Sequence, residues 1–573
     1  MKTSKWAGLV MIAGSAMVFG CSKDTEQAAN SNGKSKAVVT ASTQGAGSTT
    51  QADAAAPMAA ETPAAAPASS SGAVTPGSVE DFCCTLMPPQ QQTAIPPANT
   101  ENYLPIDENP VKQVAEAPVS TFSVDVDSGS YANVRRFILN GQRPPQDAVR
   151  VEEMINYFAY DYPAADDLAT PFRTTTHIVK TPWNPDSYLL EIGIKGYQPK
   201  GERPPANLVF LIDVSGSMED ADKLPLLKSG LRMLAGRLRP EDKVSIVVYA
   251  GAAGVVLEPT AGTERGKIES ALDQLQAGGS TAGGEGIQLA YAMARKGLIE
   301  GGINRIILAT DGDFNVGVTD IDQLKTMIEE NRKSGIALTT LGFGEGNYND
   351  ALMEQIADVG NGNYGYVDSL KEAKRLLVDQ LDATIQTIAK DVKVQVEFNP
   401  AVVAEYRLIG YENRALKRED FNNDQKDAGE IGAGHTVTAL YEIALKGAKG
   451  LVVDPLRYGD QPAPTAAPAV KPEEFAFLRL RYKAPDGDTS KLIETPLATA
   501  RFDKPESANA ELDFAAAVAA FGQKLRGGDH LKNYSYDQIA ELAKAARGSD
   551  EDGTRAEFID LVELAKALGS SGG

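Results

Sequence analysis

Between Asn207 and about Lys390, short apolar runs alternate with amphipathic helical stretches. Runs that are apolar throughout predict strands buried on both faces. We predict strands at Leu208–Ile212, Val244–Tyr249, Ile306–Ala309 and Ala337–Gly342, with helices at Lys223–Leu238, Gly286–Gly297 and Asp320–Lys333. Strands that alternate with helices build a mainly parallel sheet covered on both sides. Residues 206–390 are therefore predicted to form a doubly wound α/β domain.

The regions on both sides of this domain have the period-two pattern of antiparallel strands. Apolar residues alternate with polar or small ones at 190–195, and again at 392–398 and 478–483. Such strands keep one face in water. The first flank also has helical spacing at 134–138 and 151–158, so it is mixed. We predict that 101–205 and 391–505 together build one β-rich domain, into which the α/β domain is inserted.

The C-terminal segment, 506–573, returns to helical spacing. Phe514, Val518, Phe521 and Leu525 form one apolar stripe, and a second stripe runs from Phe558 to Leu568. Stripes of this kind face a protein core far more often than a cofactor. This segment is predicted to be a helical tail that packs on the rest of the protein.

The N-terminus has the order of a secretory signal, which we place at residues 1–20. Lys2 and Lys5 precede an apolar run from Trp6 to Phe19. That run is shorter than the roughly 20 residues that a membrane-spanning helix needs, so cleavage is the better interpretation. Residues 21–100 follow, rich in Ala, Ser, Thr, Gln, Gly and Pro, and are predicted to be a disordered tether.

The end of this signal, Val18-Phe19-Gly20-Cys21, resembles the lipobox of bacterial lipoproteins. The resemblance implies that Cys21 becomes the lipidated first residue of the mature chain, and an ordinary cleaved signal is the alternative. Because Ser22 stands where an Asp commonly retains lipoproteins in the inner membrane, the resemblance favours the outer membrane of the cell envelope, facing the periplasm or the surface.

Cys83 and Cys84 are the two other cysteines. They form either a vicinal or an intermolecular disulfide, or they are two free thiols.

Charge and motif content exclude several classes of function. Lys and Arg number 56 against 77 Asp and Glu, a net charge of -21 that repels nucleic acid. The three histidines, His177, His435 and His530, stand in no nucleophile or zinc motif, and no phosphate-binding loop is present. We therefore expect no enzyme, and an unmarked hydrolase site is the less favoured alternative.

Oxygen-bearing side chains follow the predicted α/β strands where those strands end. Asp213, Ser215 and Ser217 follow the first strand, Gly278–Gly284 contains a Ser-Thr pair, and Asp311 follows the strand at 306–309. In open α/β sheets, ligands bind at the carboxyl ends of strands near a switch point. Hydroxyls and carboxylates without His or Cys suit hard cations, which favours Mg²⁺, Mn²⁺ or Ca²⁺.

These residues resemble the von Willebrand factor A family, whose metal-ion-dependent adhesion site uses Asp-x-Ser-x-Ser with a distant Thr and a distant Asp. Matched position by position, the resemblance covers about Asn207 to Lys390 and assigns the site to Asp213, Ser215, Ser217, Thr281 and Asp311. It implies that the three hydroxyls contact the metal directly, that the carboxylates act partly through water, and that one position stays open for an acidic residue of a protein partner.

Three further stretches are similar to a YfbK-like subgroup of bacterial lipoproteins that carry this module. They are Ser120–Asp127, Val151–Phe158 and Asp427–His435, and with them the resemblance spans roughly 101–568. The subgroup implies an envelope location but has no settled activity. Two functions stay open: adhesion to a protein ligand through the metal, and a scaffold or stress factor for an envelope complex in which the metal is regulatory.

Three acidic stretches resemble parts of a calcium loop. They are Asp125–Ser130, Asn422–Asp427 and Asp550–Gly553, and none has the full 12-residue ligand set. We predict that each is a solvated acidic turn.

Overall fold

The computed structural model describes residues 100–124, 126–279, 283–312, 321–454, 471–503 and 509–570. The predicted signal, Cys21, the tether with Cys83 and Cys84, and Thr281 lie outside the described residues. Within these ranges, none of the helices has the length and hydropathy required to span a bilayer.

The predicted α/β domain is present, with a six-stranded sheet in the order β10-β9-β8-β5-β6-β7. Its strands are β5 (Ala206–Asp213), β6 (Lys243–Tyr249), β7 (Ala253–Ala261), β8 (Ile303–Thr310), β9 (Ala337–Phe343) and β10 (Tyr364–Val367). Every neighbouring pair is parallel except β6 and β7. The mainly parallel sheet is thus confirmed, and the antiparallel edge strand β7 is an addition that the sequence pattern did not predict.

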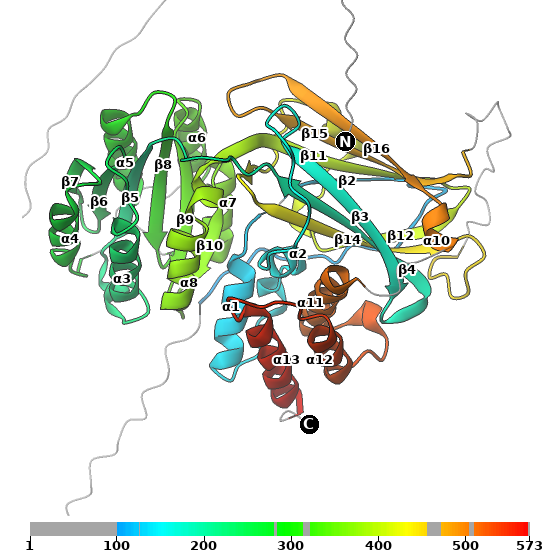
Figure 1. Cartoon of the computed structure of the whole chain (residues 1–573). Coiled ribbons are helices and arrows are strands. Elements are labelled where there is room, and N and C mark those ends of the chain that lie inside the picture. Colours follow the sequence, from blue (N-terminus) through cyan, green and yellow to red (C-terminus); the bar gives the residue numbers. More distant parts are fainter. Residues whose placement is uncertain are drawn as a thin grey trace, which may run out of the picture. The chain divides into compact units, whose positions relative to one another are not determined.

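Helices cover both faces of this sheet, as a doubly wound fold requires (Figure 1). One layer consists of α3 (Leu224–Ala235), α4 (Arg265–Asp273), α8 (Leu370–Lys374), the π-helical turn η3 (Arg375–Asp379) and α9 (Leu381–Ile385). The other consists of α5 (Gly283–Gly297), α6 (Ile321–Arg332) and α7 (Asp350–Val359). Alternate residues of β5 enter the two cores, Phe210 into the first and Leu211 into the second. A strand buried on both faces has to be apolar throughout.

The flanks of the α/β domain form two antiparallel sheets. The first contains β1 (Lys112–Gln113), β12 (Val403–Ile409), β14 (Thr436–Leu445), β4 (Asn184–Gly196) and β3 (Phe172–Thr181). The second contains β13 (Ile431–Gly432), β11 (Thr387–Phe398), β15 (Glu474–Lys483), β16 (Ser490–Ala498) and β2 (Val119–Ser123). Strands from before the α/β domain pair with strands from after it: β4 with β14, β2 with β11 and β1 with β12. The predicted insertion is confirmed.

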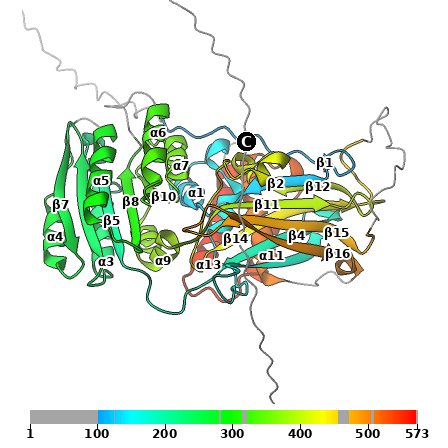
Figure 2. The same cartoon turned by 90° about the horizontal axis from the view of Figure 1, so that it is seen from above.

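The two flank sheets enclose one apolar core, and helices cover the outer face of the first sheet. Figure 2 shows the strands of both sheets beside the α/β domain. The inner core includes Phe122, Val394, Tyr441 and Leu480, which come from strands of both sheets. A second core joins the other face of β4 and β14 to α1 (Gly129–Leu139), α2 (Val151–Asn156), α11 (Ala510–Arg526), α12 (Tyr536–Ala545) and α13 (Thr554–Ser570). The predicted C-terminal stripes therefore face a core. The short helix α10 (Ala500–Asp503) follows β16.

Buried ion pairs connect the flank helices to the α/β domain. Arg150, at the start of α2, contacts Glu153 on its own helix and donates from Nη1 to Asp350 at 2.6 Å. Glu354, on α7, lies 3.8 Å from the same guanidinium group. All four side chains are buried. Charged side chains that are removed from water need oppositely charged partners nearby, so the cluster is stable only while these contacts are kept.

One of the three acidic turns is not solvated as predicted. Asp127 is buried, accepts hydrogen bonds from the Tyr364 backbone N–H at 2.7 Å and from Arg414 at 3.1 Å, and so joins the flank to β10. Asp550 accepts from two backbone N–H groups at the start of α13, and Asp424 is paired with Arg481. Partners that satisfy Asp127 lie more than 200 residues away, which is why its local sequence suggested water.

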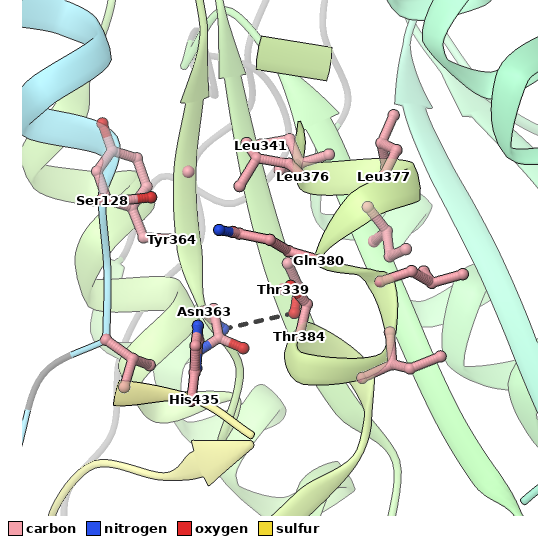
Figure 3. Close-up of a pocket in the computed structure, with 15 residues that line it drawn as sticks. Ser128, Thr339, Leu341, Asn363, Tyr364, Leu376, Leu377, Gln380, Thr384 and His435 are labelled. Carbon is pink, nitrogen blue, oxygen red and sulfur yellow. Dashed lines mark hydrogen bonds between the residues drawn. The ribbon is translucent and has the colours of Figure 1, made fainter. Parts of the chain in front are cut away.

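His435, one of the three histidines, lines a small cavity beneath β9, β10, η3 and α9 (Figure 3). The cavity holds about 30 Å³, which has room for water but not for a substrate. The His435 Nδ1 atom is buried and has no hydrogen-bond partner within the described residues. Burial lowers the pKa of His435 to about 4, and the positive charges of Arg375 and Lys195 act in the same direction.

This histidine makes stability dependent on pH. Below pH 6.5, the usual pKa of histidine, His435 is protonated in the unfolded chain, whereas in the folded chain it stays neutral until about pH 4. Its contribution is therefore complete above pH 6.5 and is lost as the pH falls toward 4, an effect of roughly 3 kcal/mol. We expect His435→Gln to lose less stability than the wild type between about pH 7 and pH 4.5 in urea titrations. Parallel losses in the two proteins would contradict this expectation.

Candidate metal site at the ends of β5 and β8

Two adjacent parallel strands bring the predicted metal ligands to one edge of the α/β sheet. Ile212 pairs with Ala309, so Asp213 and Thr310 end β5 and β8 side by side, and Asp311 follows directly. The chain leaves β5 to form β6 on one side, and β8 lies on the other. Loops that diverge at such a switch point leave a crevice where ligands bind.

The Asp213 side chain is fully buried and organises the first loop. One carboxylate oxygen accepts a hydrogen bond from the Ser215 backbone N–H at 2.8 Å, and the other accepts from the Thr310 hydroxyl at 2.8 Å. Burial raises the pKa of Asp213 to about 6, and the charge of Asp311 adds to the rise, although the hydrogen bonds oppose it. A nearby cation would favour the ionised form.

The two serines of the motif lie together after Asp213. Their Oγ atoms are 3.1 Å apart, with Ser215 buried and Ser217 half-buried. The second loop is tied to the first, because Gly216 N–H donates to Gly279 at 3.1 Å and Gly278 N–H donates to Val214 at 2.7 Å. The structure thus brings four of the five predicted residues to one edge, while Thr281, shortly after Gly279, lies outside the described residues.

Two further residues at this edge were not predicted from the sequence. Lys223, just before α3, is buried and places its Nζ 3.2 Å from both Asp311 and Asn347. Asn347, in the loop after β9, donates to the same Asp311 oxygen at 3.1 Å. Gly344 has a φ of +74°, and a Cβ at this position would lie 2.1 Å from the Lys223 side chain, so only glycine leaves room for this lysine. In the sequence, the signal for a buried side chain at this edge was this glycine, which directly follows β9.

The donor set fits a hard divalent cation. Asp213 and Asp311 carry two buried negative charges, and Lys223 supplies one positive charge. The serine hydroxyls add neutral oxygens, which Mg²⁺ and Ca²⁺ accept as ligands. Across the described ranges, no cluster of three or more His, Cys, Asp or Glu side chains is spaced to hold a metal, so a site here depends on hydroxyls as well as carboxylates.

Lys223 provides a test of this charge balance. Its ammonium group would compete with a metal for the negative charge of Asp311, and opposite charges about 4 Å apart interact by about 4 kcal/mol at an effective dielectric of about 20. We expect Lys223→Met to strengthen Mg²⁺ binding about ten-fold in calorimetric titrations. Unchanged or weaker affinity would mean that the metal does not sense this lysine.

The chain is similar to known proteins over most of its length. The family model of the von Willebrand factor type A domain matches residues 207–380, and a second, described as von Willebrand factor, matches 97–191. A third, described as the C-terminal region of the uncharacterized protein YfbK, matches 383–568. The uncharacterized protein YfbK of Escherichia coli is 49% identical over 483 residues, which is 83% of each chain.

More distant similarity is confined to part of the chain. The uncharacterized protein sll0103 of Synechocystis is 33% identical over 172 residues, 30% of this chain and 40% of that protein. Among solved structures, a von Willebrand factor type A protein from Catenulispora acidiphila covers 66% of this chain and 87% of its own, with 14% identity and a TM-score of 0.39.

Proposed function

Because this chain belongs to the YfbK family of proteins with a von Willebrand factor type A domain, we propose that it binds an acidic side chain of a protein partner through a divalent cation. Mg²⁺ is the ion we propose first, with Mn²⁺ and Ca²⁺ as substitutes. The observation that carries the proposal is the meeting of Asp213, Ser215, Ser217 and Asp311 at one sheet edge.

The composition of the site explains why the partner would be acidic. Asp311 is already shared by Lys223 and Asn347, so the protein offers the cation few uncommitted carboxylates. A cation with few anionic ligands keeps a net positive charge and attracts an external carboxylate. Hydroxyl ligands from Ser215 and Ser217, with Thr281 proposed beside them, would leave one position for that carboxylate.

A groove next to the metal loop gives the partner chain a place to lie. Its lining combines apolar side chains, such as Met218, Leu224 and Leu275, with charged ones, which are Glu219, Lys228 and Arg232. An acidic residue on the metal with neighbouring apolar residues in this groove would combine charge selectivity with buried area.

We further propose that the protein is a lipoprotein of the bacterial envelope, anchored through Cys21 and held by the tether at 21–100. Under this proposal it has no nucleic-acid partner, and its metal face meets proteins of the envelope or of another cell. A scaffold within an envelope complex would use the same metal chemistry. Protease treatment of intact cells separates the two, since cleavage within the tether requires exposure at the surface.

A pull-down from envelope extract tests the proposal. The full chain serves as bait in Mg²⁺, in EDTA, and as the Asp213→Ala variant in Mg²⁺. A partner retained only by the wild type in Mg²⁺ supports binding through the metal. The same partners under all three conditions would exclude the metal site as the contact and assign binding to the flanks.

A further inference from the structure

A second pocket lies on the flank domain and shares no residue with the metal site. It opens between the outer face of β12 and β14 and the loop after α11, and encloses about 140 Å³. On the strands, Arg407 is paired across to Glu442 and Glu405 to Ala444, so all four side chains belong to one sheet face. Val111, Gly450, Val452, Asp529, His530 and Lys532 complete most of the wall.

The carboxylates on the floor of this pocket are occupied. Glu405 accepts hydrogen bonds from the backbone N–H groups of Val452 at 3.0 Å and Val453 at 2.9 Å. Glu442 accepts four hydrogen bonds of 2.8 to 3.2 Å, from Trp183, Asn184, Ser187 and Arg407. A carboxylate has about four lone-pair sites, so Glu442 has no capacity left for a ligand that donates.

The cationic groups, by contrast, have donors to spare. Arg407 is buried and uses its Nη2 for Glu442 and Gln523, while its Nε has no hydrogen-bond partner within the described residues. Lys532 is exposed and donates to Asn184 at 2.9 Å, one bond of the three that an ammonium group can make. His530 stands at the rim, 3.6 Å from Glu108. The spare donors of Arg407 and Lys532, beside Glu442 with its acceptors filled, favour an anionic ligand.

The loop that carries His530 and Lys532 has an unusual backbone. Gly527 and Gly528 have φ values of +134° and +77°, and Lys532 has a φ of +51°. A left-handed lysine costs roughly 1 to 2 kcal/mol, and such strain is concentrated at functional sites. Leu531, between His530 and Lys532, is buried in the helical core, which anchors the loop over the pocket.

We propose that this pocket binds the carboxylate of a small organic acid with a short apolar body. Arg407 and Lys532 would hold the carboxylate, while Val111, Ala444 and Val452 form the apolar wall. Glu405, Glu442 and Asp529 leave the pocket without net positive charge, so a singly charged carboxylate fits better than a doubly charged phosphate. A cavity of this size accommodates an acid of only a few carbons.

Ligand-observed NMR and calorimetry on the full chain test the proposal with three probes: butyrate, its uncharged analogue butyramide, and inorganic phosphate. We expect saturable butyrate binding, weakened at least about ten-fold in Arg407→Gln and several-fold in Lys532→Gly, and unchanged in Lys267→Ala, which removes an exposed lysine on α4. The glutamine side chain keeps an amide donor for Glu442, and glycine suits the positive φ of the lysine that it replaces. If Arg407→Gln fails to fold, Lys532→Gly decides.

Three outcomes would overturn the proposal: equal binding of butyrate and butyramide, preference for phosphate, or butyrate affinity that neither variant changes. None of these depends on the metal site, because the probes are titrated in EDTA as well as in Mg²⁺.

Discussion

Replacing Asp213 with Ala is expected to abolish Mg²⁺ binding, weakening the affinity at least about 100-fold, while the sheet stays folded. Asp213 bonds to the loop after β5 through the Ser215 N–H and to the end of β8 through the Thr310 hydroxyl. The substitution removes a negative charge and leaves two hydrogen-bond donors without an acceptor. Each unsatisfied donor lowers the unfolding free energy by about 1 to 3 kcal/mol. Calorimetric titration with Mg²⁺, Mn²⁺ and Ca²⁺ measures the metal affinity, and circular dichroism checks the fold.

Two further variants separate charge from geometry at this position. Asp213→Asn keeps a side-chain oxygen as acceptor but loses the charge, so we expect a folded protein with little metal affinity. Asp220→Ala removes an exposed carboxylate from the same loop region and should bind metal as the wild type does. Metal affinity that survives in Asp213→Ala would exclude the assigned site.

Replacing Arg150 with Met is expected to cost about 3 to 5 kcal/mol of unfolding free energy, the largest effect on stability that we predict. The variant leaves Glu153 and Asp350 buried without their guanidinium partner. Burial already raises the pKa of Glu354 to about 8, so that neighbour is largely neutral at pH 7. Urea titration at about pH 7 measures the loss, which should shrink at about pH 5 as the stranded carboxylates take up protons.

Arg232→Met is the matched control for this effect. Arg232 pairs with Asp273 at 2.5 Å, but 40% and 65% of the two side chains are exposed, so water screens the pair. Exposed pairs contribute at most about 1 kcal/mol. Equal losses in the two variants would show that the Arg150 cluster has no special role in joining the flank to the α/β domain.

The elements with strong local patterns were predictable. β5 is apolar throughout because both its faces are buried, and β15 alternates because one of its faces is only half-buried, so the sequence of each strand reflects its environment. β7 and β10 were not predicted: β7 is a partly exposed edge strand, and β10 is only four residues long, too short for a period to be visible.

The motif residues of the candidate metal site could also be predicted from local sequence. Asp213, Ser215 and Ser217 share one loop, and the parallel pairing of β5 with β8 follows from the strand and helix order, which places Asp311 beside them. Lys223 and Asn347 were not predicted because they are 88 and 36 residues, respectively, from Asp311 in the sequence. Nothing in their neighbourhoods distinguishes a lysine before a helix or an asparagine in a turn from solvated residues.

The sequence by itself therefore determined the α/β class, its insertion between β flanks and the Asp-x-Ser-x-Ser motif at the end of β5, because periodicity and loop chemistry depend on neighbours a few residues apart. Only the tertiary structure decided the partners of buried charges. Asp127 was predicted to be solvated and instead bonds to Tyr364 and Arg414, and Arg150 finds Asp350 at a separation of 200 residues. A charged side chain has the same local sequence signature whether water or a distant partner satisfies it, and only folding chooses between the two.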